Sequence, residues 1–240
     1  MSTPVKALVT GGSGDIGAAI CRRLARAGHH VYIHARDRIG AAEILVEQIL
    51  QAGGSASMVR FDVTDADGAR AALAGLPGPI QILVNNAGMH DDAVLPGMRP
   101  EQWHRVIDVS VNGFFNVTQP LLLPMIRTRW GRIINISSVT ALIGNRGQVN
   151  YAAAKGALNA ATKALALELA TRGITVNAVA PGIIATPMTE GLFDLESLKR
   201  LVPLGRAGAP EEVASLVAFR ASEEASYITA QILSVDGGMA

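Results

Sequence analysis

The stretch Ala7-Leu8-Val9-Thr10-Gly11-Gly12-Ser13-Gly14-Asp15-Ile16-Gly17 decides the fold of this chain. It opens with an apolar run, Ala7–Thr10, that predicts a buried strand, and a helical pattern follows over Ile16–Ala27. Glycines stand between the two, at positions 11, 14 and 17. A glycine-rich turn between a strand and a helix is the context of a dinucleotide-binding fingerprint. Bare backbone can approach a pyrophosphate there, and the helix N-terminus offers free N–H groups and a positive dipole.

This turn supplies the first candidate cofactor contacts, which are Gly11, Ser13, Gly14, Asp15, Ile16 and Gly17. Asp15 is the unusual one, because a carboxylate close to a diphosphate should repel it. It can equally stand as an N-terminal residue of the helix, turned to solvent and favoured by the helix dipole. We prefer the second interpretation, because Ile16 and Gly17 still follow in register.

The rest of the chain repeats this alternation of apolar runs and helical patterns. A second helix is expected over Ala41–Ala52, where Gly53 and Gly54 end it. Further strands are expected at Val31–His34, Ser57–Phe61, Ile80–Asn85, Arg132–Ser137, Ile174–Val179 and Gln231–Val235. Strands that are apolar throughout and separated by helices indicate a parallel sheet covered on both faces. The sequence therefore predicts an α/β fold, a single Rossmann-type domain over 1–240 whose doubly wound parallel sheet has about seven strands with helices on both faces.

The stretch 182–208 has the weakest pattern of the chain. Long irregular segments in compact domains often act as lids over binding sites. We therefore expect a substrate lid near 183–202, more mobile without ligand than the sheet.

Composition excludes several classes of protein. The chain has 240 residues, 49% of them hydrophobic and 17% charged, which is typical of one globular domain rather than of a disordered chain. Its net charge of +1 gives no sign of nucleic-acid binding. No membrane span or signal peptide is expected, and the lone Cys21 fits a reducing compartment, so we expect a cytoplasmic protein. No group of residues has metal-ligand spacing, so no metal is expected.

Tyr151 and Lys155 are the candidate chemical pair. They are four positions apart in a stretch that reads as helix, so both side chains lie on one face. A free tyrosine titrates near about 10, and a neighbouring cation stabilises the phenolate. We expect Lys155 to lower the pKa of Tyr151 and make it a general acid. Taken alone, such a pair is common and is more often two exposed side chains on an ordinary helix.

Several motifs together resemble the short-chain dehydrogenase/reductase family over essentially the whole chain. The resemblance implies a catalytic tetrad of Asn112, Ser138, Tyr151 and Lys155. It also implies nicotinamide-cofactor contacts, at Asp62, Val63, Asn85, Ala87, Gly88, Tyr151, Lys155, Pro181, Gly182, Ile184 and Thr186. By the same resemblance, Ser138 donates to the substrate oxygen, Lys155 binds the nicotinamide ribose, and Asn112 orients a water that passes protons to Lys155. The family commonly has glycine at position 15, whereas the glycines at 11, 14 and 17 fit the spacing of a sister branch.

Within the family, the chain resembles the β-ketoacyl-acyl-carrier-protein reductases. The stretches that carry this resemblance are Gly144–Tyr151, Arg172–Asn177, Pro203–Arg206 and Tyr227–Gln231. It implies reduction of a 3-oxoacyl thioester on acyl carrier protein, in fatty acid or related synthesis, by a homotetramer. Alternatives are a reductase of acyl-CoA, small alcohols or sugars, and a catalytically silent dinucleotide-binding protein. Two departures are Ala230, where glycine is usual, and His90-Asp91-Asp92, which replaces a more basic stretch.

The choice between NADPH and NADH depends on the residues after the second strand. An acid there commonly binds the 2′-hydroxyl of NADH, and a basic residue accommodates the 2′-phosphate of NADPH. Arg36 favours NADPH, while Asp37 is a competing acid one place late. We therefore expect NADPH, with NADH the less favoured cofactor.

Two arginines are candidates to receive an acidic carrier protein. Arg129 precedes the fifth strand, and Arg172 follows the helix that carries Tyr151. The resemblance implies that both lie near the entrance of the site, across a subunit boundary in one arrangement. They could equally be solvated helix-end cations favoured by the dipole.

Overall fold

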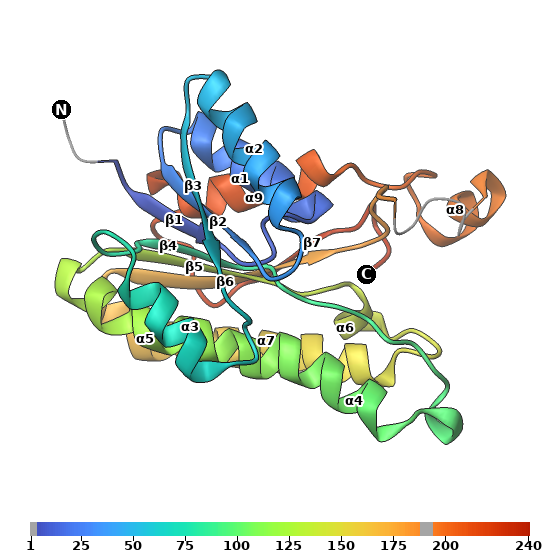
Figure 1. Ribbon diagram of the computed structural model, residues 1–240. Helices are drawn as coiled ribbons and strands as arrows, with labels where there is room; N and C mark the ends of the chain where they lie inside the picture. Colours follow the sequence, from blue (N-terminus) through green and yellow to red (C-terminus); the bar gives the residue numbers. More distant parts are fainter. Residues whose placement is uncertain (1–3, 188–193) are drawn as a thin grey trace.

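A seven-stranded parallel sheet lies between two layers of helices (Figure 1). The computed structural model describes residues 4–187 and 194–240. The strands are β1 Lys6–Val9, β2 His30–Ala35, β3 Ser55–Arg60, β4 Ile82–Asn85, β5 Gly131–Ile136, β6 Ile174–Pro181 and β7 Ile232–Val235. Their order across the sheet is β3-β2-β1-β4-β5-β6-β7, and all neighbours are parallel. The predicted α/β fold and each predicted strand are confirmed, with ends that differ by no more than two residues.

The helices divide between the two faces of the sheet, as in Figure 1. One layer packs α1, α2 and α9 against the sheet, and the other packs α3, α5 and α7. The bounds are α1 Asp15–Arg26, α2 Ile39–Gln51, α3 Ala66–Ala74, α4 Pro100–Ile107, α5 Gly113–Thr128, α6 Thr140–Ile143, α7 Val149–Leu169, α8 Leu195–Leu201 and α9 Pro210–Ala221. The arrangement is the doubly wound one that the alternation of patterns predicts.

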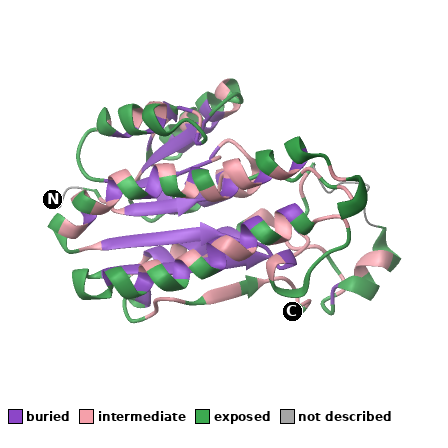
Figure 2. Cartoon of the chain, turned by 90° about the horizontal axis from the view of Figure 1, so that it is seen from below, coloured by how far each residue is buried: buried purple, intermediate pink, exposed green. Residues whose placement is uncertain are grey.

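Alternate residues of each strand supply the two hydrophobic cores. In β1, Ala7 and Val9 face the layer of α1, α2 and α9, while Leu8 faces the layer of α3, α5 and α7. Successive side chains of a strand point to opposite faces, so a strand covered on both sides must be apolar at every position. Figure 2 shows the central strands buried along their length, with exposed residues on the outer faces of the helices.

The strand order reverses between β1 and β4, and this junction positions the site. From β1 the chain proceeds outward to β2 and β3, then returns to β4 on the other side of β1. After β1 the chain passes to the layer of α1, and after β4 it passes to the layer of α5, so the two connections lead to opposite faces of the sheet. Ligands of open α/β sheets bind in the crevice at such a topological switch point.

The segment after β6 lies partly outside the described residues. Ile184 forms a parallel bridge with Gly208, and the N–H of Ala185 donates to the Gly208 carbonyl at 2.7 Å. Of the lid predicted near 183–202, Met188–Phe193 fall outside the described residues. Within 4–187 and 194–240, no helix is long and apolar enough to cross a membrane.

Candidate active site

The glycine-rich turn joins the end of β1 to the start of α1, as predicted. Gly11 has φ of +61°, a conformation that strains residues with a side chain. A Cβ on Gly17 would lie 2.3 Å from the Gly11 carbonyl oxygen, whereas a Cβ on Gly14 would meet nothing closer than 3.4 Å. Gly17 therefore lets α1 pack against the turn, and Gly14 leaves bare backbone at its outer side. Ser13 is half-buried beside them.

Asp15 is the first residue of α1, which fits the preferred interpretation of this residue. A carboxylate in the first turn interacts favourably with the helix dipole. Its side chain is half-buried, and Ile16 beside it reaches the pocket described below.

The turn is fixed to the loop after β4 by a set of polar contacts. The Thr10 hydroxyl accepts from the N–H groups of Asn86 and Ala87, both at 2.9 Å. The Asn86 side chain donates in return to the carbonyls of Thr10 at 2.9 Å and Gly11 at 3.1 Å. Asn86 thus joins the two sides of the switch point, a role for which the sequence motif gave no separate signal.

A pocket of about 250 Å³ opens at the carboxyl ends of the strands next to this turn. Predicted site residues from five separate parts of the chain line it. These are Ile16, Gly88, Ser138, Tyr151, Lys155, Pro181, Gly182, Ile184 and Thr186. Gly182 can only be glycine here, because a Cβ would lie 2.7 Å from the Asp236 Cα.

Ser138 and Tyr151 are hydrogen-bonded to each other in this pocket. Ser138 follows β5 and is 8% exposed, and its Oγ also accepts from the Thr140 N–H at 3.2 Å. The serine therefore both caps the turn after the strand and faces the phenol. Two hydroxyls held side by side can donate to one carbonyl oxygen.

The expected lowering of the Tyr151 pKa is wrong. Burial raises the pKa of this phenol above its usual 10, the bond with Ser138 opposes that rise, and the charge of Asp92 adds to it. The physical reason is that a buried phenolate loses its hydration, while the Lys155 Nζ is directed elsewhere. The phenol is therefore protonated at neutral pH, although the raised pKa also makes it a weaker acid than a free tyrosine.

Lys155 is buried below the tyrosine on α7. Its Nζ donates to the Ile136 carbonyl at 2.8 Å and lies 5.7 Å from the centre of the Tyr151 ring. Burial lowers the pKa of this ammonium to about 8, so it remains mostly charged at pH 7. A Cβ on Gly88 would lie 3.1 Å from the Nζ, so the glycine leaves room beside the charge.

Asn112 does not line the pocket. It ends a π-helical turn, Asp108–Asn112, between α4 and α5, and its exposed side chain donates to the Asp108 carboxylate at 2.7 Å. The π-helical turn directs Ser110 inward instead. The Ser110 hydroxyl is buried, and among the described residues it has no hydrogen-bond partner.

Asn85 and Val63 also lie away from the pocket surface. The buried Asn85 amide donates to Thr118 at 3.0 Å and to Asn135 at 2.9 Å, and Asn135 continues to Thr162 at 2.8 Å. This network joins β4, β5, α5 and α7 under the site, so the Asn85 side chain is committed to the core. Val63 is 5% exposed and belongs to the core on the α3 side.

Arg36 follows β2, and two carboxylates surround it. Its Nε donates to Asp37 at 2.7 Å, and its Nη1 lies 3.6 Å from Asp62. Asp62 also accepts from the N–H and hydroxyl of Thr64, both at 2.8 Å. Asp37, the competing acid, is therefore an orienting partner of the guanidinium. All three charged groups lie at the carboxyl ends of β2 and β3.

Acidic residues lie at the mouth of the pocket. The Gln148 amide donates to Asp92 at 2.8 Å, and His90 Nδ1 lies 3.4 Å from the same carboxylate. Arg105 Nη1 lies 3.4 Å from Asp91, whose side chain also accepts from Gln102 at 2.7 Å. The stretch His90-Asp91-Asp92 is a departure from the family pattern, whereas Gln148, a single glutamine before a helix, carries no signal in the sequence.

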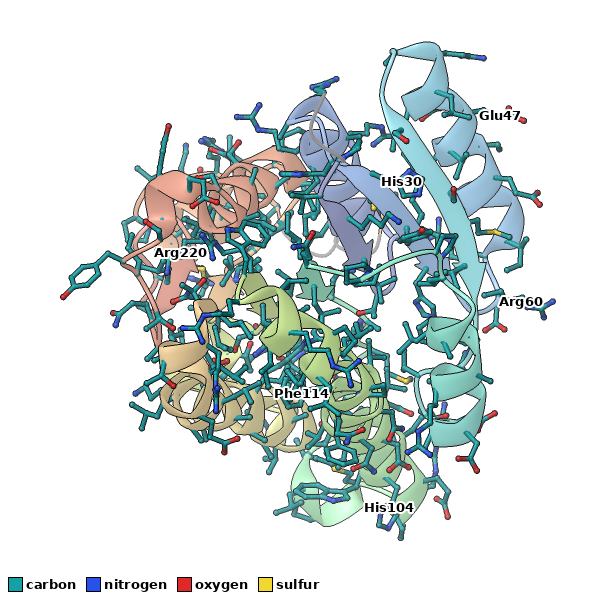
Figure 3. The ribbon with its side chains drawn as sticks, turned by 90° about the vertical axis from the view of Figure 1, so that its left-hand side faces the viewer. His30, Glu47, Arg60, His104, Phe114 and Arg220 are labelled. Atoms are coloured by element: carbon teal, nitrogen blue, oxygen red, sulfur yellow. The ribbon has the colours of Figure 1, made fainter. Side chains whose placement is uncertain are left out.

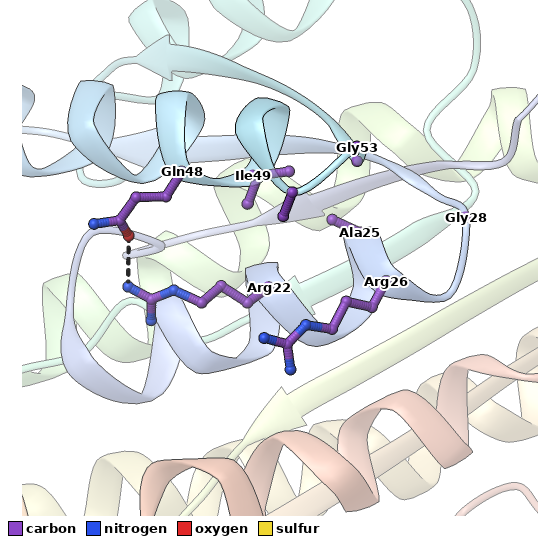
Figure 4. Close-up of a pocket in the computed structure, with 9 residues that line it drawn as sticks. Arg22, Ala25, Arg26, Gly28, Gln48, Ile49 and Gly53 are labelled. Atoms are coloured by element: carbon purple, nitrogen blue, oxygen red, sulfur yellow. Dashed lines mark hydrogen bonds between the residues drawn. The ribbon is translucent and has the colours of Figure 1, made fainter.

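Another cavity, of about 460 Å³, lies between the last turns of α1 and α2 (Figure 4). Arg22 and Arg26 line it from one face of α1, and the Arg22 guanidinium donates to Gln48 at 3.0 Å. Cations in the last turn of a helix interact favourably with its dipole. This cavity is at the opposite end of α1 from the glycine-rich turn, so it is separate from the site.

The histidines do not converge. Figure 3 shows His30 and His104 on opposite sides of the molecule. Across 4–187 and 194–240, no three His, Cys, Asp or Glu side chains are grouped so that they could hold a metal ion.

Known proteins that this chain is similar to are reductases or dehydrogenases by name. Residues 12–240 match the family model described as enoyl-(acyl carrier protein) reductase. The 3-oxoacyl-[acyl-carrier-protein] reductase of Aggregatibacter actinomycetemcomitans is 44% identical, over 97% of this chain and 98% of its own. The acetoacetyl-CoA reductase of an Acinetobacter strain is 42% identical, over 100% and 99%. The crystal structure of a gluconate 5-dehydrogenase from Burkholderia cenocepacia, in complex with NADP and tartrate, superposes with a TM-score of 0.92 at 35% identity, over 98% of this chain and 94% of its own.

The chain belongs to the short-chain dehydrogenase/reductase family. It is an oxidoreductase, and within the family it is of the 3-oxoacyl-[acyl-carrier-protein] reductase type.

Proposed function

We propose that this protein reduces the 3-oxo group of an acyl thioester on acyl carrier protein with NADPH, in fatty acid or related acyl-chain synthesis. The observation that carries the proposal is the hydrogen-bonded pair of Ser138 and Tyr151 in a pocket that Lys155 shares. A silent dinucleotide-binding protein has no use for a half-buried proton donor with a second hydroxyl beside it. Relatives that are 42% to 44% identical over nearly the whole chain carry this activity in their names.

The residues of the pocket divide the work of carbonyl reduction. Bound NADPH supplies the hydride. Ser138 holds the substrate oxygen and stabilises the negative charge that develops on it. Tyr151, protonated at neutral pH, donates the proton to that oxygen. The Lys155 Nζ, 5.7 Å from the centre of the Tyr151 ring, keeps a positive charge in the same pocket at pH 7.

Three features of the chain support NADPH as the cofactor. The turn leaves bare backbone at Gly14, and the N-terminus of α1 offers its first N–H groups to a pyrophosphate. Arg36 presents a guanidinium that Asp37 and Asp62 orient, which suits a 2′-phosphate. The gluconate 5-dehydrogenase, similar over the whole chain, was solved with NADP.

Exposed apolar side chains in the segments around the pocket residues favour an acyl substrate over a sugar acid. Leu142 and Ile143 follow Ser138, Val149 precedes Tyr151, and Leu95 lies in the loop that the Ala93 N–H joins to Gly147. An apolar rim excludes water from an alkyl chain but gives a polyol no hydrogen-bond partners. The carboxylate of Asp92 beside the pocket would also repel a sugar acid.

A substrate panel tests the proposal. NADPH oxidation should be fast with acetoacetyl carrier protein and slower with acetoacetyl-CoA. It should be near background with crotonyl carrier protein and with 5-ketogluconate. Preference for CoA would favour the function named for the Acinetobacter relative, and crotonyl reduction would favour the enoyl reductase described for the family model. Activity confined to 5-ketogluconate would contradict the proposal.

We further propose a cytoplasmic homotetramer in which the carrier protein docks on Arg129 and Arg172. The two arginines lie near each other at the amino ends of β5 and β6, and the Arg129 guanidinium donates to the Thr171 carbonyl at 3.3 Å. Within one chain, the amino ends of the strands lie opposite to the pocket, which is at the carboxyl ends. Docking at these arginines therefore needs the pocket of a neighbouring subunit. We also propose that the segment near 183–202 is a lid over the substrate pocket.

Reversing both charges, Arg129→Glu with Arg172→Glu, should raise KM for acetoacetyl carrier protein severalfold or more. Docking arginines steer an acidic partner, so turnover of acetoacetyl-CoA should change much less, and added salt should shrink the defect. Arg23→Glu with Arg26→Glu, at two exposed positions of α1, is the matched control on another part of the surface. Equal losses with both substrates would indicate an assembly defect, and no loss with either would remove these arginines from carrier docking.

A further inference from the structure

His34 is buried directly beneath the glycine-rich turn. It lies near the carboxyl end of β2, is 3% exposed, and its ring packs against Phe61 with 4.1 Å between the ring centres. The N–H of Gly11 donates to its Nδ1 at 2.9 Å, and its Nε2 lies 2.9 Å from the Phe61 carbonyl oxygen. One side chain therefore joins the start of the turn to the end of β3.

These two partners fix the protonation of the ring. A backbone N–H can only donate, so Nδ1 must be the unprotonated nitrogen and accept. A carbonyl oxygen can only accept, so Nε2 must carry the proton and donate. His34 is thus held as the neutral Nε2–H tautomer, and a proton on Nδ1 would point at the Gly11 N–H.

The surroundings of the ring agree with this assignment. Burial lowers the pKa of His34, the bond to Phe61 and the charge of Asp62 oppose the shift, and Arg36 reinforces it. The ring consequently stays neutral at pH 7. The Thr10 hydroxyl and the Asn86 amide hold the other side of the turn.

The turn depends on His34 through its backbone as well. The Gly12 N–H donates to the His34 carbonyl at 2.9 Å, so two consecutive N–H groups of the turn bond to one residue. The side-chain bond acts on Gly11, which has φ of +61°. A glycine can adopt many other backbone conformations, because it has no side chain. A fixed acceptor for this N–H selects one conformation from them.

We propose that His34 is a positioning residue for the cofactor, which holds the glycine-rich turn in its binding conformation through the acceptor it presents to Gly11. The inference rests on the proposed use of a nicotinamide dinucleotide by this chain. His34 touches no reacting atom in this role. Because the turn is already ordered, cofactor binding does not lose the free energy that ordering it would require.

Two matched substitutions separate the two bonds of the ring. In His34→Asn the amide oxygen stands as many bonds from Cα as Nδ1 does, so an acceptor for Gly11 remains and the bond to Phe61 is lost. In His34→Gln the amide nitrogen stands where Nε2 does, so the bond to Phe61 remains and the acceptor for Gly11 is lost. Both variants keep a polar side chain in the same cavity, and thermal unfolding of each measures any general loss of stability.

NADP⁺ affinity, measured by calorimetry on the cofactor-free protein, should separate the variants. We expect Kd to rise about tenfold in His34→Gln, which leaves a buried N–H without an acceptor, and less than about threefold in His34→Asn. Turnover at saturating NADPH should stay within about twofold of the wild type in both, so the defect appears in KM. Equal affinities, or weaker binding by His34→Asn than by His34→Gln, would overturn the proposal.

Nitrogen NMR of the cofactor-free wild type gives a second readout that needs no ligand. The His34 ring should show the neutral Nε2–H tautomer at pH 7 and should titrate below the ordinary 6.5. An Nδ1–H tautomer would overturn the proposal. A wild type that binds neither NADP⁺ nor NAD⁺ but shows the expected tautomer would contradict the proposed function and the cofactor role of His34 together. Equal affinities among variants of a binding enzyme would contradict only the role of His34.

Discussion

Turnover in the reduction of acetoacetyl thioesters should fall by at least about a hundredfold when Tyr151 is replaced with phenylalanine. The substitution removes one oxygen and leaves the ring that packs beside Lys155. Ser138 would then be the remaining hydroxyl that faces the substrate oxygen. A serine hydroxyl is a far weaker acid than a phenol, so it can hold this oxygen but donates its proton poorly.

The loss should be confined to the chemical step. The Kd for NADPH, measured by fluorescence, should stay within about threefold of the wild type, because the phenol oxygen is a small part of the cofactor site. Tyr227→Phe is the matched control, since this tyrosine is fully exposed on the surface. Near wild-type turnover in Tyr151→Phe would rule out the proposed proton donor.

The second large effect concerns the choice of cofactor. Arg36→Asp should raise KM for NADPH by about tenfold or more and change KM for NADH far less. The substitution replaces attraction of the 2′-phosphate with repulsion, in a place where Asp37 and Asp62 already supply two negative charges. In the wild type the guanidinium offsets those charges.

Arg38→Asp is the control for this experiment, because it makes the same change of charge two residues later on the exposed start of α2. It should leave the ratio of NADPH to NADH efficiency almost unchanged. If Arg36→Asp left that ratio in place and Arg38→Asp shifted it, the selecting cation would be Arg38. Steady-state kinetics with both cofactors at fixed ionic strength distinguishes the two results.

Much of the fold could be predicted because its signals are local. Runs such as Ala7–Val9 are apolar at every position, which only a strand covered on both faces needs. The glycines of the turn predict close approaches of backbone. The structure agrees at Gly17, where a Cβ would lie only 2.3 Å from the Gly11 carbonyl oxygen. The spacing of Tyr151 and Lys155 on one helix similarly fixed their common face.

The rest depended on contacts between distant segments. Asn112 and Ser110 are two positions apart, and only the π-helical turn decides that the serine is the buried one. The pKa of Tyr151 depends on how deeply its ring is buried and on Asp92, which lies far away in sequence. Asn85 looked like a pocket residue until its partners on β5 and α5 placed it in the core.

The junction of β1 and β4 has a consequence for how the molecule resists unfolding. The turn after β1 and the loop after β4 are joined by Thr10 and Asn86, and a dinucleotide laid across them would contact both halves of the sheet at once. Such a ligand binds only while the halves stay docked, so its binding energy opposes their separation. At a hundred times its Kd, a ligand of this kind adds about 2.7 kcal/mol to the free energy of unfolding. The cofactor would then also hold the β1 side and the β4 side of the sheet together. The resistance of the junction between them to proteases would increase with the cofactor concentration.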